Sequence, residues 1–221
     1  WPDLKLSQYK VQAEGIDKPI AELIVAQQGD GPRVLTYWKN STNEILYNLD
    51  RKPSELSALA AVIGKHAPKD ALILSWWDTS RQIKLLTGHD TLFTSHLNEP
   101  LMVPVAWLEQ SKAIMAYENQ FWESSANSKE QEQFKRFSQA LAASAAQLRE
   151  LIGSNREAYL IVHVTDLYKL GLMYPDKIGV AYQNFPLTGN MHGMINHMKV
   201  QLKENDFNTY KGAQDIKVNP I

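Results

Sequence analysis

Residues 71 to 99 read Ala-Leu-Ile-Leu-Ser-Trp-Trp-Asp-Thr-Ser-Arg-Gln-Ile-Lys-Leu-Leu-Thr-Gly-His-Asp-Thr-Leu-Phe-Thr-Ser-His-Leu-Asn-Glu, and the prediction of the fold rests on this stretch. The short apolar run Ala71–Ser75 is typical of a buried strand. A side chain among residues 78–80 can then cap a helix that Gly88 ends. A second strand is expected over Thr91–Ser95. The stretch therefore predicts a compact strand-helix-strand unit.

A later part of the chain has the same order of features. The run Tyr159–Val164 predicts a strand, Thr165-Asp166 begins a short helix that ends near Gly171, and Val180–Phe185 predicts the next strand. Two such units imply neighbouring parallel strands with helices on their faces. The likeness is one of order and not of identity, so we infer no internal repeat.

The first fifty residues have a different pattern. Gly29-Asp30-Gly31 can supply the positive φ angles of a tight hairpin between two runs rich in β-forming residues. Residues 1–50 are therefore predicted to be an antiparallel portion. Its expected strands are Leu4–Ala13, Ala21–Gln28, Pro32–Lys39 and Glu44–Leu49.

Helical periodicity accounts for much of the remainder. Ser54 is the expected N-cap of a helix with a stripe of Leu56, Leu59, Ala60 and Ile63. Further helices are expected over Val105–Glu123, Lys129–Ile152 and Met191–Leu202, with an edge strand over Tyr210–Val218. The fold class predicted is α/β, with a mixed, largely parallel sheet flanked by helices and an N-terminal antiparallel hairpin portion. Residues 1–221 are expected to form a single soluble domain, divided into residues 1–50 and 51–221.

Composition narrows the possible functions. The formal net charge is -1, so there is no basic excess to neutralise nucleic-acid phosphates. The absence of cysteine excludes disulfides, thiolate metal ligands and the Cys-x-x-Cys-His attachment site of c-type haem. No apolar run is long enough to cross a bilayer, and Trp1 stands where a start methionine would be. We expect that a signal peptide or an anchor preceded it, or that a cloning decision set the start.

The Trp-Trp-Asp segment is the candidate site, because ligands and partners gather where strand ends meet helix N-termini. An aspartate in the first turn of a helix also binds free amides, and that role alone explains Asp78 and Asp166. Paired with Asp78, Arg81 could instead face an anion or a partner. The candidate partner- or ligand-binding residues are Trp76, Trp77, Asp78, Thr79, Ser80, Arg81, Gln82, His89, His96 and Asp166.

The sequence gives little support for a metal site or for a catalytic serine nucleophile. His89 and His96 flank an expected strand and are expected to lie too far apart to share one ion. His192 and His197 are five apart on an expected helix and so point to different faces. No Gly-x-Ser-x-Gly motif is present. We therefore expect no catalytic residue, no metal and no cofactor.

The central segment, residues 74–88, resembles two protein families. Leu74-Ser75-Trp76-Trp77-Asp78 with Gln82-Ile83 resembles the Trp-Trp-Asp motif in the soluble domain of oligosaccharyltransferase catalytic subunits, although Thr79-Ser80 replaces the Tyr-Gly of that family. The resemblance implies an α/β fold and a binding surface, and not glycosyl transfer, because this sequence does not contain that enzyme's membrane domain. Residues 76–83 together with Leu85-Leu86-Thr87-Gly88 are similar to the HaoB family of accessory proteins in hydroxylamine oxidation. That resemblance implies a periplasmic protein tethered by an anchor before Trp1 and associated with the multihaem hydroxylamine oxidoreductase.

These observations leave three hypotheses. The leading one is a non-catalytic accessory protein that binds this oxidoreductase through Trp77, Asp78, Arg81 and the loop His89–Glu99, with aromatic and arginine anchors. The rival is a sugar-binding or small-anion-binding, transferase-like domain that uses Asp78, Arg81, Gln82 and Asp166 at the strand ends. In the third hypothesis, the motif serves only in packing.

Overall fold

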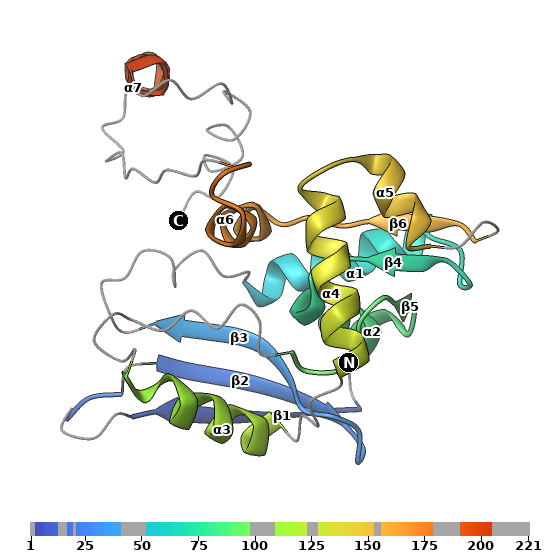
Figure 1. Cartoon of the computed structure of the whole chain (residues 1–221). Coiled ribbons are helices and arrows are strands. Elements are labelled where there is room, and N and C mark those ends of the chain that lie inside the picture. The colour runs from blue at the N-terminus through green and yellow to red at the C-terminus, as the bar shows by residue number, and fades with distance from the viewer. Residues whose placement is uncertain are drawn as a thin grey trace. The chain divides into compact units, whose positions relative to one another are not determined.

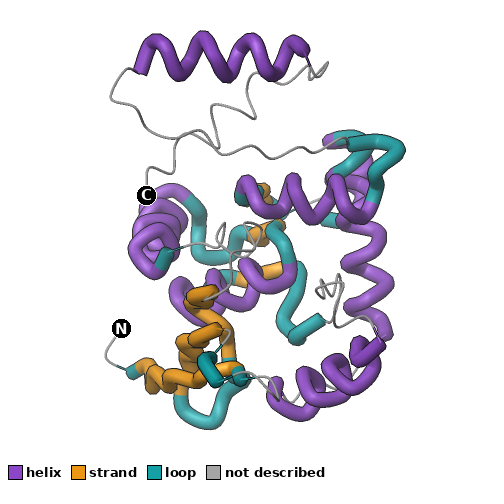
Figure 2. Tube along the Cα trace, turned by 90° about the vertical axis from the view of Figure 1, so that its left-hand side faces the viewer, coloured by secondary structure: helices purple, strands orange, loops and turns teal. Residues whose placement is uncertain are grey.

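The computed structural model describes residues 3–12, 17–19, 21–40, 52–97, 109–122, 128–152, 156–178 and 191–204. It contains both helices and strands, with an antiparallel sheet and a separate parallel sheet (Figures 1 and 2), which confirms the α/β class. The chain forms two compact units, Trp1–Val162 and His163–Ile221. The single domain over residues 1–221 stays a prediction.

The N-terminal portion is an antiparallel sheet, as predicted. Its order is β1-β2-β3, with β1 over Leu4–Val11, β2 over Ala21–Gln28 and β3 over Val34–Asn40. The turn between β2 and β3 depends on Gly29, whose φ of 53° lies in the left-handed region that glycine adopts without strain. The strand expected over Glu44–Leu49 lies outside the described residues.

Helix α3, Ser111–Trp122, covers one face of this sheet (Figure 1). Leu23 and Val25 of β2 are buried with Trp122, because alternate residues of a strand point to the same face. Phe121 packs edge-on against Tyr9 of β1, with ring centroids 5.0 Å apart. The observed helix lies inside the range Val105–Glu123 that helical periodicity predicted.

A second sheet is parallel, as the two strand-helix-strand units predicted. Its order is β5-β4-β6, with β4 over Leu72–Leu74, β5 over Asp90–Thr91 and β6 over Ala158–Leu160. Both outer strands run parallel to β4, and Ile73 stands opposite Thr91 and Tyr159. The extent predicted for β5, Thr91–Ser95, is wrong. The backbone N–H of Ser95 donates to the Glu130 carboxylate at 2.9 Å, and this bond is made outside the sheet.

Two clusters form the core around the parallel sheet. Ile63 of α1 (Pro53–His66) and Ile83 of α2 (Trp77–Thr87) are buried against Ile73. The second cluster is aromatic: the ring of Phe134, on α4 (Ser128–Leu141), lies 4.9 Å from Trp76 and 5.5 Å from Phe93. Fully buried aromatic rings remove large apolar areas from water, so this cluster is a main source of stability for the first unit.

Three helix boundaries differ from the sequence-based expectations. Helix α1 begins one residue before the predicted cap Ser54, because the Glu55 carboxylate accepts the backbone N–H of Lys52 at 2.9 Å. Helix α2 begins at Trp77, so Asp78 lies in its first turn and is not its cap. The long helix expected over Lys129–Ile152 is interrupted after α4. Ser144 caps the separate helix α5, Ala145–Glu150, by accepting from the backbone N–H of Gln147.

The second unit contains α6, Val164–Met173, and α7, Met191–Glu204. Both confirm predicted helices. The strands expected over Val180–Phe185 and Tyr210–Val218 lie outside the described residues. Among the described helices, none combines the length and the apolar character that crossing a membrane requires.

Candidate functional site

The Trp-Trp-Asp segment connects strand β4 to helix α2. The first helical hydrogen bond runs from the backbone N–H of Ser80 to the carbonyl of Trp76, at 2.8 Å. The buried hydroxyls of Ser75 and Ser80 lie 2.8 Å apart, and the Ser80 hydroxyl also donates to the Ser75 carbonyl at 3.1 Å. These contacts fix the direction in which the chain leaves the sheet.

The two tryptophans occupy different environments. Trp76 is 1% exposed and packs on Phe134, whereas Trp77 is half-buried against the imidazole of His96, with ring centroids 4.7 Å apart. Only one of the two rings enters the core, and neither residue belongs to the strand. Of the two rings, Trp77 alone retains appreciable access to solvent.

The two predicted aspartates both act at helix starts. Asp78 is half-buried, and its Oδ1 accepts from the backbone N–H and the hydroxyl of the buried Thr79, at 2.6 and 3.2 Å. In the second unit, Oδ2 of Asp166 accepts the backbone N–H of His163 at 2.8 Å and closes a capping box. A carboxylate in the first turn also suits the helix dipole. These helix-start interactions confirm the capping role for Asp166 and a related role for Asp78.

Arg81 and Gln82 point into the protein and reach the antiparallel sheet. They are 5% and 8% exposed. The guanidinium of Arg81 donates to the Arg33 carbonyl at 2.5 Å, and the amide of Gln82 donates to the Leu35 carbonyl at 2.8 Å. Both acceptors lie on or next to the edge strand β3. Helix α2 therefore links the parallel sheet to the antiparallel sheet through buried polar contacts.

His96 completes this link. Its Nδ1 lies 3.2 Å from a guanidinium nitrogen of Arg81. Arginine can only donate, so Nδ1 accepts and Nε2 carries the ring proton. The imidazole also stacks on Trp122, with centroids 4.9 Å apart and planes 15° from parallel. We call the set Trp77, Arg81, His96 and Trp122 the inter-sheet cluster.

Burial keeps His96 neutral. Desolvation is the main cause that lowers its pKa to about 3, and the charge of Arg81 acts in the same direction, against the opposing effect of Asp78. Desolvation also lowers the pKa of Arg81 to about 10, against the charges of Asp78 and Glu130. At neutral pH the inter-sheet cluster therefore contains a charged guanidinium and a neutral imidazole, which is the combination that their hydrogen bond requires.

This burial predicts a loss of stability in acid. The unfolded state binds a proton at His96 near the ordinary pKa of 6.5, whereas the folded state resists it until about pH 3. The stability that the neutral His96 contributes is thus fully present above pH 6.5 and is lost as the pH falls from 6.5 to about 3. Allowing for partial solvent access, we expect the step to be about 2 kcal/mol between pH 7 and pH 4.5.

Urea unfolding of the wild type and of His96→Gln at both pH values measures the step. The glutamine side-chain oxygen can accept from Arg81 but does not titrate in this range. The free-energy difference between the two proteins should therefore change by that amount. The same difference at pH 7 and pH 4.5 would show that His96 does not carry the effect.

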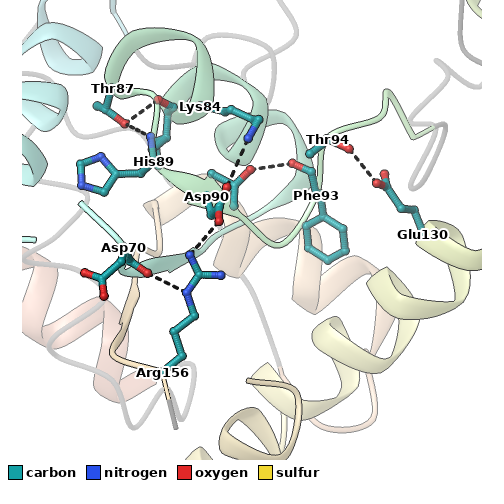
Figure 3. Close-up of polar contacts among 11 residues, drawn as sticks. Asp70, Lys84, Thr87, His89, Asp90, Phe93, Thr94, Glu130 and Arg156 are labelled. Atoms are coloured by element: carbon teal, nitrogen blue, oxygen red, sulfur yellow. Dashed lines mark hydrogen bonds and ion pairs between the residues drawn. The ribbon is translucent and has the colours of Figure 1, made fainter. Parts of the chain in front are cut away.

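Charged side chains hold strand β5 and the loop that follows it (Figure 3). The Glu130 carboxylate accepts the Thr94 hydroxyl at 2.9 Å, and Asp90 pairs with Arg156 at 2.7 Å and with Lys84 at 3.5 Å. The second predicted histidine of this region, His89, is buried, and its Nε2 lies 3.4 Å from the Ala67 carbonyl. The last residues of the predicted loop His89–Glu99, from residue 98 onward, lie outside the described part.

The structure thus brings together only part of the predicted site. Residues 76–82 and His96 lie around one helix start, His89 lies beside Ala67, and Asp166 belongs to the other unit. Sequence reasoning missed Trp122, because nothing in the chain signals that it stacks on a histidine 26 positions earlier. In the described residues, no group of three or more histidines and carboxylates is placed to hold a metal ion.

A family model described as "HaoA-associated protein HaoB" matches residues 1–217. No curated protein and no solved structure matches the chain.

Proposed function

The chain belongs to the HaoB family of HaoA-associated proteins, and we propose that it serves hydroxylamine oxidation as a non-catalytic accessory partner of the multihaem oxidoreductase HaoA. The observation that carries this proposal is the family match, which spans nearly the whole chain. The resemblance of residues 76–88 to the same family indicates the same role.

The chemistry of the chain supports a contact role. With no cysteine, the chain cannot attach a c-type haem through Cys-x-x-Cys-His, so such haems would belong to the partner. Arg81 and Gln82, which a ligand-binding site would need as donors, bind backbone carbonyls of the same chain. These contacts count against a sugar or small-anion site at Arg81 and Gln82.

We further propose that the protein works on the outer side of the cytoplasmic membrane, tethered by a segment before Trp1. This location follows from the resemblance to the HaoB family, and it would place the chain beside a periplasmic oxidoreductase. Fractionation of source cells should find the native protein with the membranes, released by detergent and not by osmotic shock. Recovery in the cytoplasmic fraction would contradict the location without affecting the partnership.

Capture from native extract tests the partnership. Tagged protein incubated with a detergent extract of the source membranes should retain HaoA, recognisable by its haem absorbance and by peptide mass. Heat-unfolded tagged protein is the control for nonspecific retention. Absence of HaoA from the captured material, when HaoA is present in the extract, would refute the proposal.

A further inference from the structure

One edge of the antiparallel sheet, β1, pairs with no further strand among the described residues. All eight residues of β1 stand opposite β2 in an uninterrupted register, from Leu4 opposite Gln28 to Val11 opposite Ala21. Its other side has no strand partner among the described residues, since β1 is the last strand in the sheet order. A long, regular, open edge presents a row of backbone donors and acceptors to which another strand can pair.

The opposite edge of the same sheet differs. There the carbonyls of Arg33 and Leu35 accept hydrogen bonds from Arg81 and Gln82, so helix α2 occupies the start of β3. The β2–β3 register also shifts between Ile24 and Val25, which makes β3 irregular. Of the two edges, β1 is therefore the one suited to accept a further strand.

The side chains along β1 indicate what kind of strand would fit. Lys5 and Lys10 are exposed and β1 contains no acidic residue, although Glu22 of β2 stands opposite Lys10 in the register. Leu6 is 64% exposed and lies on the same face of β1 as Lys10, whereas Lys5 lies on the other face. Basic and apolar side chains on one strand are complementary to a partner strand that carries carboxylates and an apolar residue.

Helix α3 adds an aromatic contact next to this edge. Tyr117 is 69% exposed, and its ring lies parallel to Phe121 at 6.4 Å between centroids. Phe121 in turn packs on Tyr9 of β1. Exposed tyrosines are frequent anchors at protein interfaces, because a large rigid ring loses little conformational entropy on binding.

We propose that HaoA binds at the free edge of β1 by adding an extended acidic segment as a fourth strand, with Tyr117 as the flanking aromatic contact. This inference rests on the proposed function. Backbone hydrogen bonds would supply affinity, and the lysines would select the partner. A second copy of this chain is disfavoured as the added strand, because two adjoining β1 strands would bring together four lysines and no carboxylate.

Charge reversal tests the proposal. In a titration of purified HaoA, the double variant Lys5→Glu with Lys10→Glu should bind at least about tenfold more weakly than the wild type. Tyr117→Ala should weaken binding by roughly threefold or more. The matched control reverses the exposed Lys65 and Lys69, which changes the net charge equally and should leave the affinity within about twofold. Circular dichroism melting verifies that each variant folds.

Hydrogen exchange of the wild-type protein provides a readout that needs no substitution. Amides of Leu4–Val11 that face the open edge should exchange several-fold more slowly when HaoA is bound. If HaoA binds while β1 exchange and the double variant's affinity stay unchanged, the inference is overturned and the proposed function stands. If HaoA does not bind the wild type, both the inference and the proposed function are refuted. A dimer of the chain alone with protected β1 amides would assign the edge to a second copy and overturn the inference.

Discussion

Replacing Trp76 with alanine is expected to lower the free energy of unfolding by about 4 kcal/mol, the largest effect of any substitution in the Trp-Trp-Asp segment. Its indole is 1% exposed and meets the ring of Phe134 edge-on at 4.9 Å. Truncation would remove this burial and leave a cavity beside β4, which the surrounding rings cannot fill without leaving their rotamers. Chemical denaturation of both proteins at pH 7 measures the loss.

The neighbouring tryptophan is the matched control. Trp77 is half-buried against His96, so Trp77→Ala should cost about 1 to 2 kcal/mol, less than half the loss at Trp76. Equal losses at the two positions would contradict the assignment of Trp76 to the core and of Trp77 to the inter-sheet cluster.

Replacing Arg81 with lysine is expected to lower the free energy of unfolding by about 2 to 3 kcal/mol, even though the charge is conserved. Burial already disfavours the charged group, as its lowered pKa shows, and a lysine would bear the same cost. An ammonium lacks the planar fork with which Arg81 reaches the Arg33 carbonyl and His96 together. At least one buried acceptor would then lose its donor.

Arg136 on α4 offers the control, because it is exposed. Arg136→Lys should change the free energy of unfolding by less than about 0.5 kcal/mol. A comparable result for Arg81→Lys would mean that the bonds between α2 and β3 contribute nothing to stability, and would remove the basis for treating the segment as the link between the sheets.

Local pattern explains why so much of the fold was predictable. Apolar runs, the Gly29 turn and the Gly88 helix end each depend on a few neighbouring residues, so sequence alone located the two kinds of sheet. Gly88 has a φ of 72°, as expected of a glycine that ends a helix. The predicted bounds were wrong where a contact from a distant residue, or a helix cap with a weak sequence signal, ended an element. Glu130 holds the loop after Thr91, and Ser144 divides a helix whose periodicity alone looked continuous.

The candidate site was less predictable, because burial is a property of the whole fold. A Trp-Trp-Asp-x-x-Arg pattern at a strand end can face solvent or the interior, and the sequence does not contain the information that β3 lies beside α2. The acceptors of Arg81 and Gln82 are 48 and 47 positions away. That the segment contacts a partner remains a prediction for Trp77, Asp78 and His96, which are half-buried.

The most direct test of how this chain works is the affinity of Arg81→Met for purified HaoA, at a temperature where circular dichroism shows the variant to be folded. Arg81 acts inside the protein, so we predict that the variant binds HaoA within about twofold of the wild type, whatever its stability. A folded variant that loses tenfold or more in affinity would contradict this, and would make the Trp-Trp-Asp segment itself the contact surface.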